Sequence, residues 1–171
     1  ASDSKPKLPF TDVSTSDWFY SDVMFVYENG LFSGTDSRSF SPNASMTRAM
    51  LVTVLYRLEG EPTVTGRSSF TDVRSGAYYE KAVIWAAANG IVTGTDSTSF
   101  SPDAKVTREQ LAAILYRYAQ YRKLDTDAGA KLDSFSDAGN VSGYASEALS
   151  WAVSEGLING ASGRLMPKGD A

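Results

Sequence analysis

The stretch GTDSRSFSP at residues 34–42 returns as GTDSTSFSP at residues 94–102, with a single difference in the nine positions. A shorter version occupies residues 160–167. Each copy follows, at a similar distance, an opening tetrapeptide that reads FTDV from Phe10, FTDV from Phe70 and FSDA from Phe135. Matches that keep both order and spacing identify tandem repeats, so one repeat unit is expected to decide the whole fold.

Each repeat is predicted to begin with a helix that starts at an aromatic residue and ends at a glycine. Glycine is common just past the last helical turn because it adopts the left-handed conformation without steric cost. One face of these helices carries small apolar residues, which allows neighbouring helices to approach closely. An aromatic residue lies off that face in each copy, and it either packs elsewhere or faces a groove. The predicted helices span residues 18–30, 78–90 and 144–156, with Phe25, Trp85 and Trp151 as the aromatic residues.

A second helix is predicted after the turn-rich loop in the first two repeats, starting at Thr47 and at Thr107. Apolar residues recur there at i, i+3, i+4 and i+7, from residue 51 to 58 and from residue 111 to 118. This is the pattern of an amphipathic helix. With little strand expected, the predicted fold class is all-α.

The repeats and the segments between them set the expected organisation of the chain. Residues 1–9 are small, polar and basic, which is typical of a flexible lead-in. The repeats are expected at residues 10–60, 70–120 and 135–171, with linkers at 61–69 and 121–134.

Composition excludes several classes of function. The 171 residues include no Cys and no His, which removes disulfides, thiolate chemistry, Cys/His zinc sites and Ser-His-Asp catalysis. The net charge is −4 and no cluster of cations is present, so nucleic acid is not an expected partner. No apolar run approaches the roughly 18–20 residues that cross a bilayer. Neither a cofactor nor a metal is expected, because the GTDS turns lack the spaced acidic residues of a calcium loop.

In these features the chain resembles the S-layer homology family from Phe10 to Ala171. The resemblance rests on the FTDV openings, the Gly-containing helix ends, the Phe-Ser-Pro turns and the Thr-Arg starts of the second helices. It implies three helix–loop–helix repeats in a pseudo-threefold, three-pronged arrangement around a central helix bundle. It also implies a secreted module of the bacterial cell wall or S-layer. Such a module binds a secondary cell-wall polysaccharide, often pyruvylated, in grooves between repeats.

The resemblance assigns glycan binding first to Arg48 and Arg108, which follow the threonines of the two Thr-Arg motifs. A guanidinium suits an acidic sugar because its planar fork holds a carboxylate with two parallel hydrogen bonds. A helix start adds free backbone N–H groups and the positive end of the helix dipole. The alternative is that these arginines are solvated or paired with an aspartate of the repeat.

Three further pairs of residues are candidates for the same glycan site, and each has a structural alternative. The aromatic rings stack on a sugar or pack in the core, the aspartates accept sugar hydroxyls or cap turns, and the glycines admit a ligand or serve backbone geometry. These pairs are Trp18 and Tyr78, Asp12 and Asp72, and Gly34 and Gly94.

The third repeat is expected to lack its arginine. Its counterpart of Arg48 falls beyond Ala171, so any groove that needs a third arginine is expected to be absent or impaired.

Two other functions compete with glycan binding. One is a structural role, in which the module associates with other copies of an S-layer or surface protein. A glycosidase needs two opposed carboxylates, whereas the prominent aspartates recur at turn positions in every repeat. We therefore expect no enzymatic activity.

Overall fold

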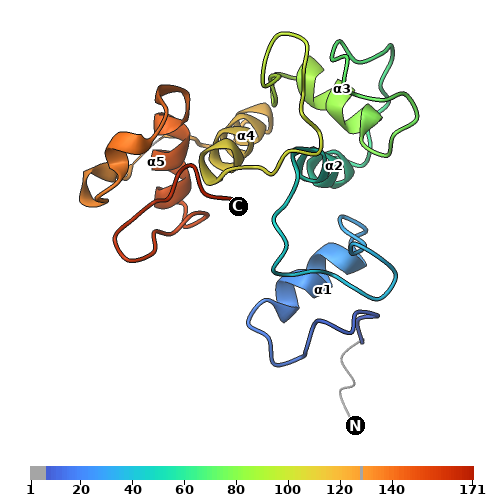
Figure 1. The fold of residues 1–171 in the computed structure, drawn as a ribbon, viewed down its shortest axis with the longest axis horizontal. Coiled ribbons are helices and arrows are strands. Elements are labelled where there is room, and N and C mark those ends of the chain that lie inside the picture. The colour runs from blue at the N-terminus through green and yellow to red at the C-terminus, as the bar shows by residue number, and fades with distance from the viewer. Residues whose placement is uncertain (1–6, 128) are drawn as a thin grey trace.

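The computed structural model describes residues 7–127 and 129–171, and its regular structure is helical (Figure 1). The described residues form no strand, only isolated bridges, which confirms the all-α prediction. The α-helices are α1 (Tyr20–Glu28), α2 (Arg48–Leu58), α3 (Glu80–Ala88), α4 (Arg108–Tyr121) and α5 (Ser146–Ser154). Three short 3₁₀ turns precede α5: η1 (Leu132–Ser134), η2 (Ala138–Asn140) and η3 (Gly143–Ala145).

The first helix of each repeat ends as the glycines predict. Gly30, Gly90 and Gly156 have φ of 65°, 68° and 71°, in the left-handed region. At the end of α1, the N–H of Gly30 donates to the carbonyl of Tyr27 at 3.1 Å and the next N–H donates to Val26 at 2.8 Å. The ends of α3 and α5 repeat these two bonds. The last carbonyls of each helix are thereby satisfied and the chain turns sharply into its loop.

The second helices start at the two predicted threonines. The Thr47 side chain accepts a hydrogen bond from the N–H of Met50, and the Thr107 side chain accepts one from Gln110. The side-chain oxygen of Gln110 in turn accepts a hydrogen bond from the N–H of Thr107, which completes a capping box. These caps fix the residue that follows each threonine at the first helical position.

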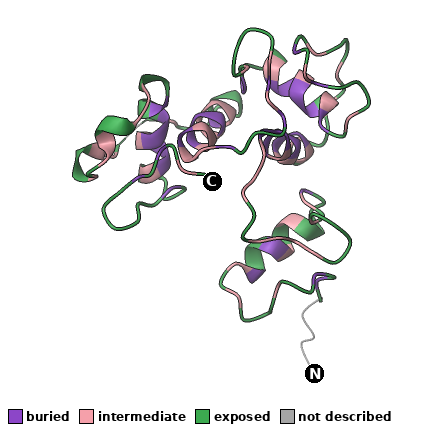
Figure 2. Cartoon of the chain, viewed as in Figure 1, coloured by how far each residue is buried: buried purple, intermediate pink, exposed green. Residues whose placement is uncertain are grey.

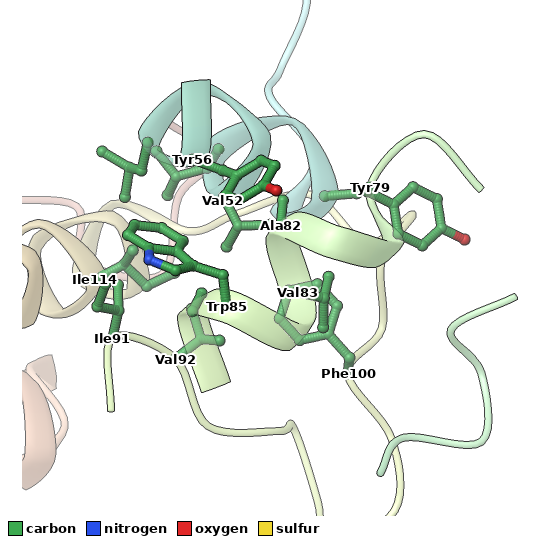
Figure 3. Packing of buried hydrophobic residues seen from close by; sticks show 14 of the residues in the cluster. Val52, Tyr56, Tyr79, Ala82, Val83, Trp85, Ile91, Val92, Phe100 and Ile114 are labelled. Carbon is green, nitrogen blue, oxygen red and sulfur yellow. The ribbon is translucent and has the colours of Figure 1, made fainter. Parts of the chain in front are cut away.

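Helices of different repeats pack in pairs. The second helix of one repeat packs on the first helix of the next repeat, so that α2 lies against α3 and α4 lies against α5 (Figure 1). The largest core cluster joins α2 and α3 around Val52, Ala82, Trp85 and Phe100 (Figure 3). The repeats therefore share their cores.

Helix α1 has no comparable partner among the helices of the described residues. Its apolar side chains are accordingly more exposed than those of α3 (Figure 2). Phe25 is 57% exposed, whereas its counterparts Trp85 and Trp151 are 3% and 6% exposed. The sequence left open whether these aromatic residues pack elsewhere or face a groove. In α3 and α5 they are packed and buried.

The three repeats meet in a ring of backbone hydrogen bonds at the starts of the second helices. Val106 donates to the carbonyl of Met46 at 2.9 Å, Ala171 donates to Val106 at 2.9 Å, and Met46 donates to Ala171 at 3.4 Å. These are equivalent positions of the three repeats. The pseudo-threefold arrangement as a whole stays a prediction.

The start of the chain packs further into repeat one than its composition indicates. Residues 1–6 of the predicted flexible lead-in lie outside the described residues. Leu8 is buried and packs with Phe10, Tyr20 and Val23 in a small core of repeat one. Packing of this repeat therefore starts within the segment assigned to the lead-in.

Helix α3 packs against α2, whereas α1 has no such partner among the described helices. Truncation of equivalent side chains on the two helices is therefore expected to lower the free energy of unfolding by different amounts. Trp85→Ala is expected to lower the free energy of unfolding by about 3–5 kcal/mol, because it empties a packed core. Phe25→Ala, at the equivalent position of α1, is expected to cost about 0.5 kcal/mol or less. Chemical denaturation followed by circular dichroism measures both. Equal losses would contradict the assignment of α1 as a helix without a packing partner.

Candidate functional site: two equivalent grooves

A groove of 370 Å³ lies where three repeats meet, and we call it the Gly94 groove. Repeat two supplies its loop at residues 92–95 and one face of α4. Repeat one contributes Arg48 from the start of α2, and repeat three contributes Tyr144. The volume falls within the range of small-ligand sites, roughly 300–1,000 Å³.

A second groove of 290 Å³, the Gly34 groove, repeats the first at the preceding repeat. It is lined by the loop at residues 32–35, by one face of α2 and by Tyr78. Its loop and helix residues recur 60 positions later in the Gly94 groove, and Tyr144 takes the place of Tyr78. The helix pairs are Met50 and Gln110, Thr53 and Ala113, Val54 and Ile114, and Arg57 and Arg117.

Arg48 reaches from repeat one into repeat two. Its Nε donates to the carbonyl of Phe100 at 2.9 Å and its Nη2 donates to the carbonyl of Thr93 at 3.2 Å. The guanidinium also lies over the Phe100 ring, 4.8 Å from the centroid. Although it is only 5% exposed, the side chain forms no ion pair in the described part of the chain. Three of its five N–H donors are therefore left for a ligand.

Burial lowers the pKa of Arg48, and the nearby charge of Arg117 lowers it further, while Tyr144 and Asp72 oppose the shift. Arginine remains charged at any physiological pH. The Gly94 groove therefore contains a permanent positive charge with no acidic residue in its lining.

Arg108 makes the same pair of bonds one repeat further along. Its Nε donates to the carbonyl of Leu165 and its Nη2 donates to the carbonyl of Asn159, both at 2.8 Å. It is half-buried and forms no ion pair with any described residue. Salt bridges from the two motif arginines to Asp12 or Asp72 are thus not observed in the described residues.

The predicted aspartates are engaged with backbone. Both carboxylate oxygens of Asp12 accept N–H groups, from Phe40 at 2.9 Å and Ser41 at 2.8 Å. Asp72 holds residues 100 and 101 in the same way, and Asp137 holds residues 165 and 166. Each aspartate ties the start of its repeat to the far end of the loop, which is the turn-capping alternative raised by the sequence.

The two predicted glycines line the two grooves, and their surroundings leave no room for a side chain. A Cβ at Gly94 would lie 2.2 Å from the carbonyl oxygen of Asp96 and 2.7 Å from the Phe70 ring. A Cβ at Gly34 would lie 2.6 Å from the Phe10 ring. The glycines are therefore required by local packing, and they also leave bare backbone at the groove wall.

The predicted aromatic residues are separated by the fold. Tyr78 lines the Gly34 groove and is 62% exposed. Trp18 is 88% exposed and lines neither groove, since it borders an apolar hollow with Phe40 and Pro42. The aromatic wall of the Gly94 groove is Tyr144, which the sequence prediction placed only at a helix start.

A buried acidic residue holds Tyr144 and repeat three against α4. Glu109 accepts hydrogen bonds from the N–H and hydroxyl of Ser142, from the Lys168 ammonium, and from the Tyr144 hydroxyl at 3.4 Å. Burial raises the pKa of Glu109, but the Lys168 and Ser142 hydrogen bonds outweigh it and lower the pKa overall. Glu109 is therefore an anion at neutral pH.

Tyr144, Glu109 and Arg117 were missed because the sequence shows no contact between repeats. The sequence signal that could have identified Tyr144 and Arg117 was their position within the repeat. Tyr144 stands two residues before α5, as Tyr78 stands two residues before α3, and Arg117 stands 60 positions after Arg57.

The family profile described as the S-layer homology domain matches three segments of the chain, residues 9–49, 69–112 and 134–169. The chain belongs to the S-layer homology domain family, as its tandem motifs indicate. This domain is a non-catalytic anchoring module, and the protein is associated with the cell surface.

Curated relatives carry the same module within much longer proteins. An endoglucanase of Bacillus sp. (strain KSM-635) is 31% identical over 94% of this chain and 17% of its own length. A surface-layer 125 kDa protein of Lysinibacillus sphaericus is 30% identical over 72% of this chain and 10% of its length. A cellulosome-anchoring protein of Acetivibrio thermocellus is 27% identical over 64% of this chain and 26% of its length. The chain thus spans a small fraction of each relative.

None of the helices that the structure describes has the length and apolar character needed to cross a membrane. Within the described part of the chain, no group of three or more acidic side chains is placed to hold a metal ion.

The aspartate contacts predict a loss of stability in acid. The backbone N–H groups of Phe40 and Ser41 lower the pKa of Asp12 from 3.8, and those of Leu165 and Met166 do the same for Asp137. Because the folded pKa lies below the unfolded value, this stabilisation is complete above pH 3.8 and is lost as pH falls through the folded pKa. The melting temperature, measured from pH 7 to pH 2, is expected to fall in that window.

Asp12→Asn is expected to reduce this acid dependence, because the amide does not titrate. Asp133→Asn, at an exposed site without a hydrogen bond to any described residue, is the control and is expected to melt like the parent at each pH. An Asp12→Asn profile identical to the parent profile would contradict the role of the carboxylate.

Loss of Glu109 is expected to loosen repeat three. Glu109→Ala leaves the N–H of Ser142 and the Tyr144 hydroxyl without their acceptor, at a cost of about 1–3 kcal/mol. Hydrogen exchange is expected to accelerate at the amide of Ser142 and in η3, while α2 and α3 keep their protection. Uniform acceleration across all three repeats would count against a local role.

Proposed function

We propose that this chain anchors a larger secreted protein to the bacterial cell wall by binding an acidic secondary cell-wall polysaccharide in the Gly94 groove. The observation that carries the proposal is the position of Arg48. Its guanidinium is buried at the groove, holds two carbonyls, keeps free donors, and faces no acidic residue in the groove lining. A sugar carboxylate supplies the charge that such a site lacks.

A pyruvylated amino sugar is the ligand that we propose for this groove. Its ketal carboxylate pairs with Arg48, its ring packs on Tyr144, and its polar groups reach the backbone at Gly94. The sugar is small and rigid and carries one charge, which matches a groove with a single aromatic wall. Relatives named for anchoring and for surface layers support a cell-wall partner of this kind.

The other predicted residues take different places in this proposal. Tyr78 and Gly34 belong to the Gly34 groove, which has the same wall but no arginine at the place of Arg48 among the described residues. Arg108 takes the position equivalent to Arg48 at the next repeat, where it donates to the carbonyl of Asn159 in repeat three. Asp12 and Asp72 shape the loops, and Trp18 takes no part in either groove.

Self-association is a second candidate function, and the exposed apolar residues of repeat one favour it. Trp18, at 88% exposure, and Phe25, at 57%, offer apolar surface to another copy or to another surface protein. Hydrolysis is disfavoured, because no aspartate or glutamate lines either groove.

Calorimetric titration with a pyruvylated amino-sugar disaccharide tests the proposal. The parent is expected to bind saturably, and Arg48→Gln is expected to bind at least about tenfold more weakly, since hydrogen bonds to charged groups contribute about 1.5–3 kcal/mol. Tyr144→Ala is expected to weaken binding without unfolding the chain, because this ring is already 55% exposed. Circular dichroism checks the fold of each variant.

Arg108→Gln is the matched control, because it removes the same group from the same helix position outside the Gly94 groove. It is expected to bind like the parent at that groove. If the parent does not bind the disaccharide and associates with itself in a concentration-dependent way in sedimentation, self-association would become the proposed function in place of glycan binding.

A further inference from the structure

Arg117 is a second cation in the Gly94 groove. It lies on α4 and lines the same cavity as Arg48. In the described part of the chain its side chain has neither a hydrogen bond nor an ion pair. Its charge lowers the pKa of Arg48 and opposes the rise in the pKa of Tyr144, so the three side chains are within electrostatic range of one another.

The equivalent arginine of the other groove is compensated. Arg57 donates from Nη1 to the carbonyl of Leu31 at 3.2 Å, and its Nε lies 4.0 Å from a carboxylate oxygen of Glu61. Sixty positions later, the place of Glu61 is taken by Tyr121, which has no carboxylate. The arginine at this helix position therefore has a carboxylate within ion-pair distance in the Gly34 groove, and it has none among the described residues in the Gly94 groove.

The acidic residue that holds Tyr144 does not supply the missing charge. Glu109 is buried, does not line the groove, and already accepts hydrogen bonds from Lys168 and Ser142. Two guanidinium groups thus share one cavity without an anion. Like charges repel each other, and an anion bound between them relieves that repulsion and gains attraction from both.

We infer that Arg117 is a ligand-binding residue of the Gly94 groove, and that Arg48 and Arg117 together hold the acidic group of the bound sugar. The inference rests on the proposed function and adds to it a specific requirement. The sugar must carry its negative charge within reach of both helices α2 and α4. A carboxylate and a phosphate ester both meet this requirement, since each offers several acceptor oxygens to two guanidinium groups.

The test uses three disaccharides that differ only at the acidic group. One carries a pyruvate ketal, the second carries the methyl ester of that ketal, and the third carries a phosphate monoester in its place. The full 171-residue chain is compared with Arg117→Gln and Arg117→Lys by calorimetry. Lys81→Gln, an exposed residue of α3 that lines neither groove, is the control for net charge.

With the charged ketal, Arg117→Gln is expected to bind at least about tenfold more weakly than the parent, while Lys81→Gln binds within about twofold of it. Arg117→Lys is expected to recover part of the loss, because it restores the charge without the planar fork. With the neutral methyl ester, the parent and Arg117→Gln are expected to bind equally weakly. Tighter binding of the phosphate ester, with the same dependence on Arg117, would support the two-cation site and identify phosphate as the acidic group.

One result would overturn the inference while leaving the proposed function intact, namely a parent that binds the ketal while Arg117→Gln binds it equally well. Equal binding of the ketal and its neutral ester by the parent would overturn the inference together with the proposed pairing of the sugar carboxylate with Arg48. A parent that binds none of the three sugars would overturn the inference together with the proposed glycan binding.

Discussion

The hydrogen bonds that Arg48 donates to Thr93 and Phe100 join two repeats through one side chain, and much of the structure depends on them. They require Thr47 to start α2 at the right residue, so that the guanidinium reaches the following loop. They also require that loop to present its carbonyls, which Asp72 ensures by holding its far end. The start of α2, the shape of the loop and the contact between the two repeats therefore depend on one another.

Arg48 joins two repeats and also lines the Gly94 groove. Two of its donors hold the fold and the remainder have no partner among the described residues, so the guanidinium that we propose as the sugar-binding group is already held in place. Immobilisation reduces the entropy that binding must otherwise overcome. It also means that a variant of Arg48 affects both the contact between repeats and the groove. Variants of Arg117, whose side chain has no hydrogen bond or ion pair in the described part of the chain, separate the two effects.

Local features of the fold followed from the sequence, and contacts between repeats did not. Left-handed glycines and threonine caps are decided within a few residues, so the ends of α1 and α3 and the starts of α2 and α4 were predictable. Arg48 was predicted as a site residue because its motif is local. Tyr144 and Arg117 reach the Gly94 groove from different repeats, and no periodicity along the chain encodes that meeting. The exposed position of Phe25 was equally hidden, because its equivalents Trp85 and Trp151 are covered by a helix of the preceding repeat.

Because the Gly94 groove combines Arg48 from the first repeat, a loop and helix from the second, and Tyr144 from the third, the repeat that is duplicated along the chain and the groove proposed to bind the sugar are different units. A single repeat cut from this chain does not contain the whole of either groove. Copying a repeat therefore creates new surfaces at its junctions with the repeats on either side. A substitution in one repeat therefore changes the lining of a groove whose loop and helix belong to a neighbouring repeat.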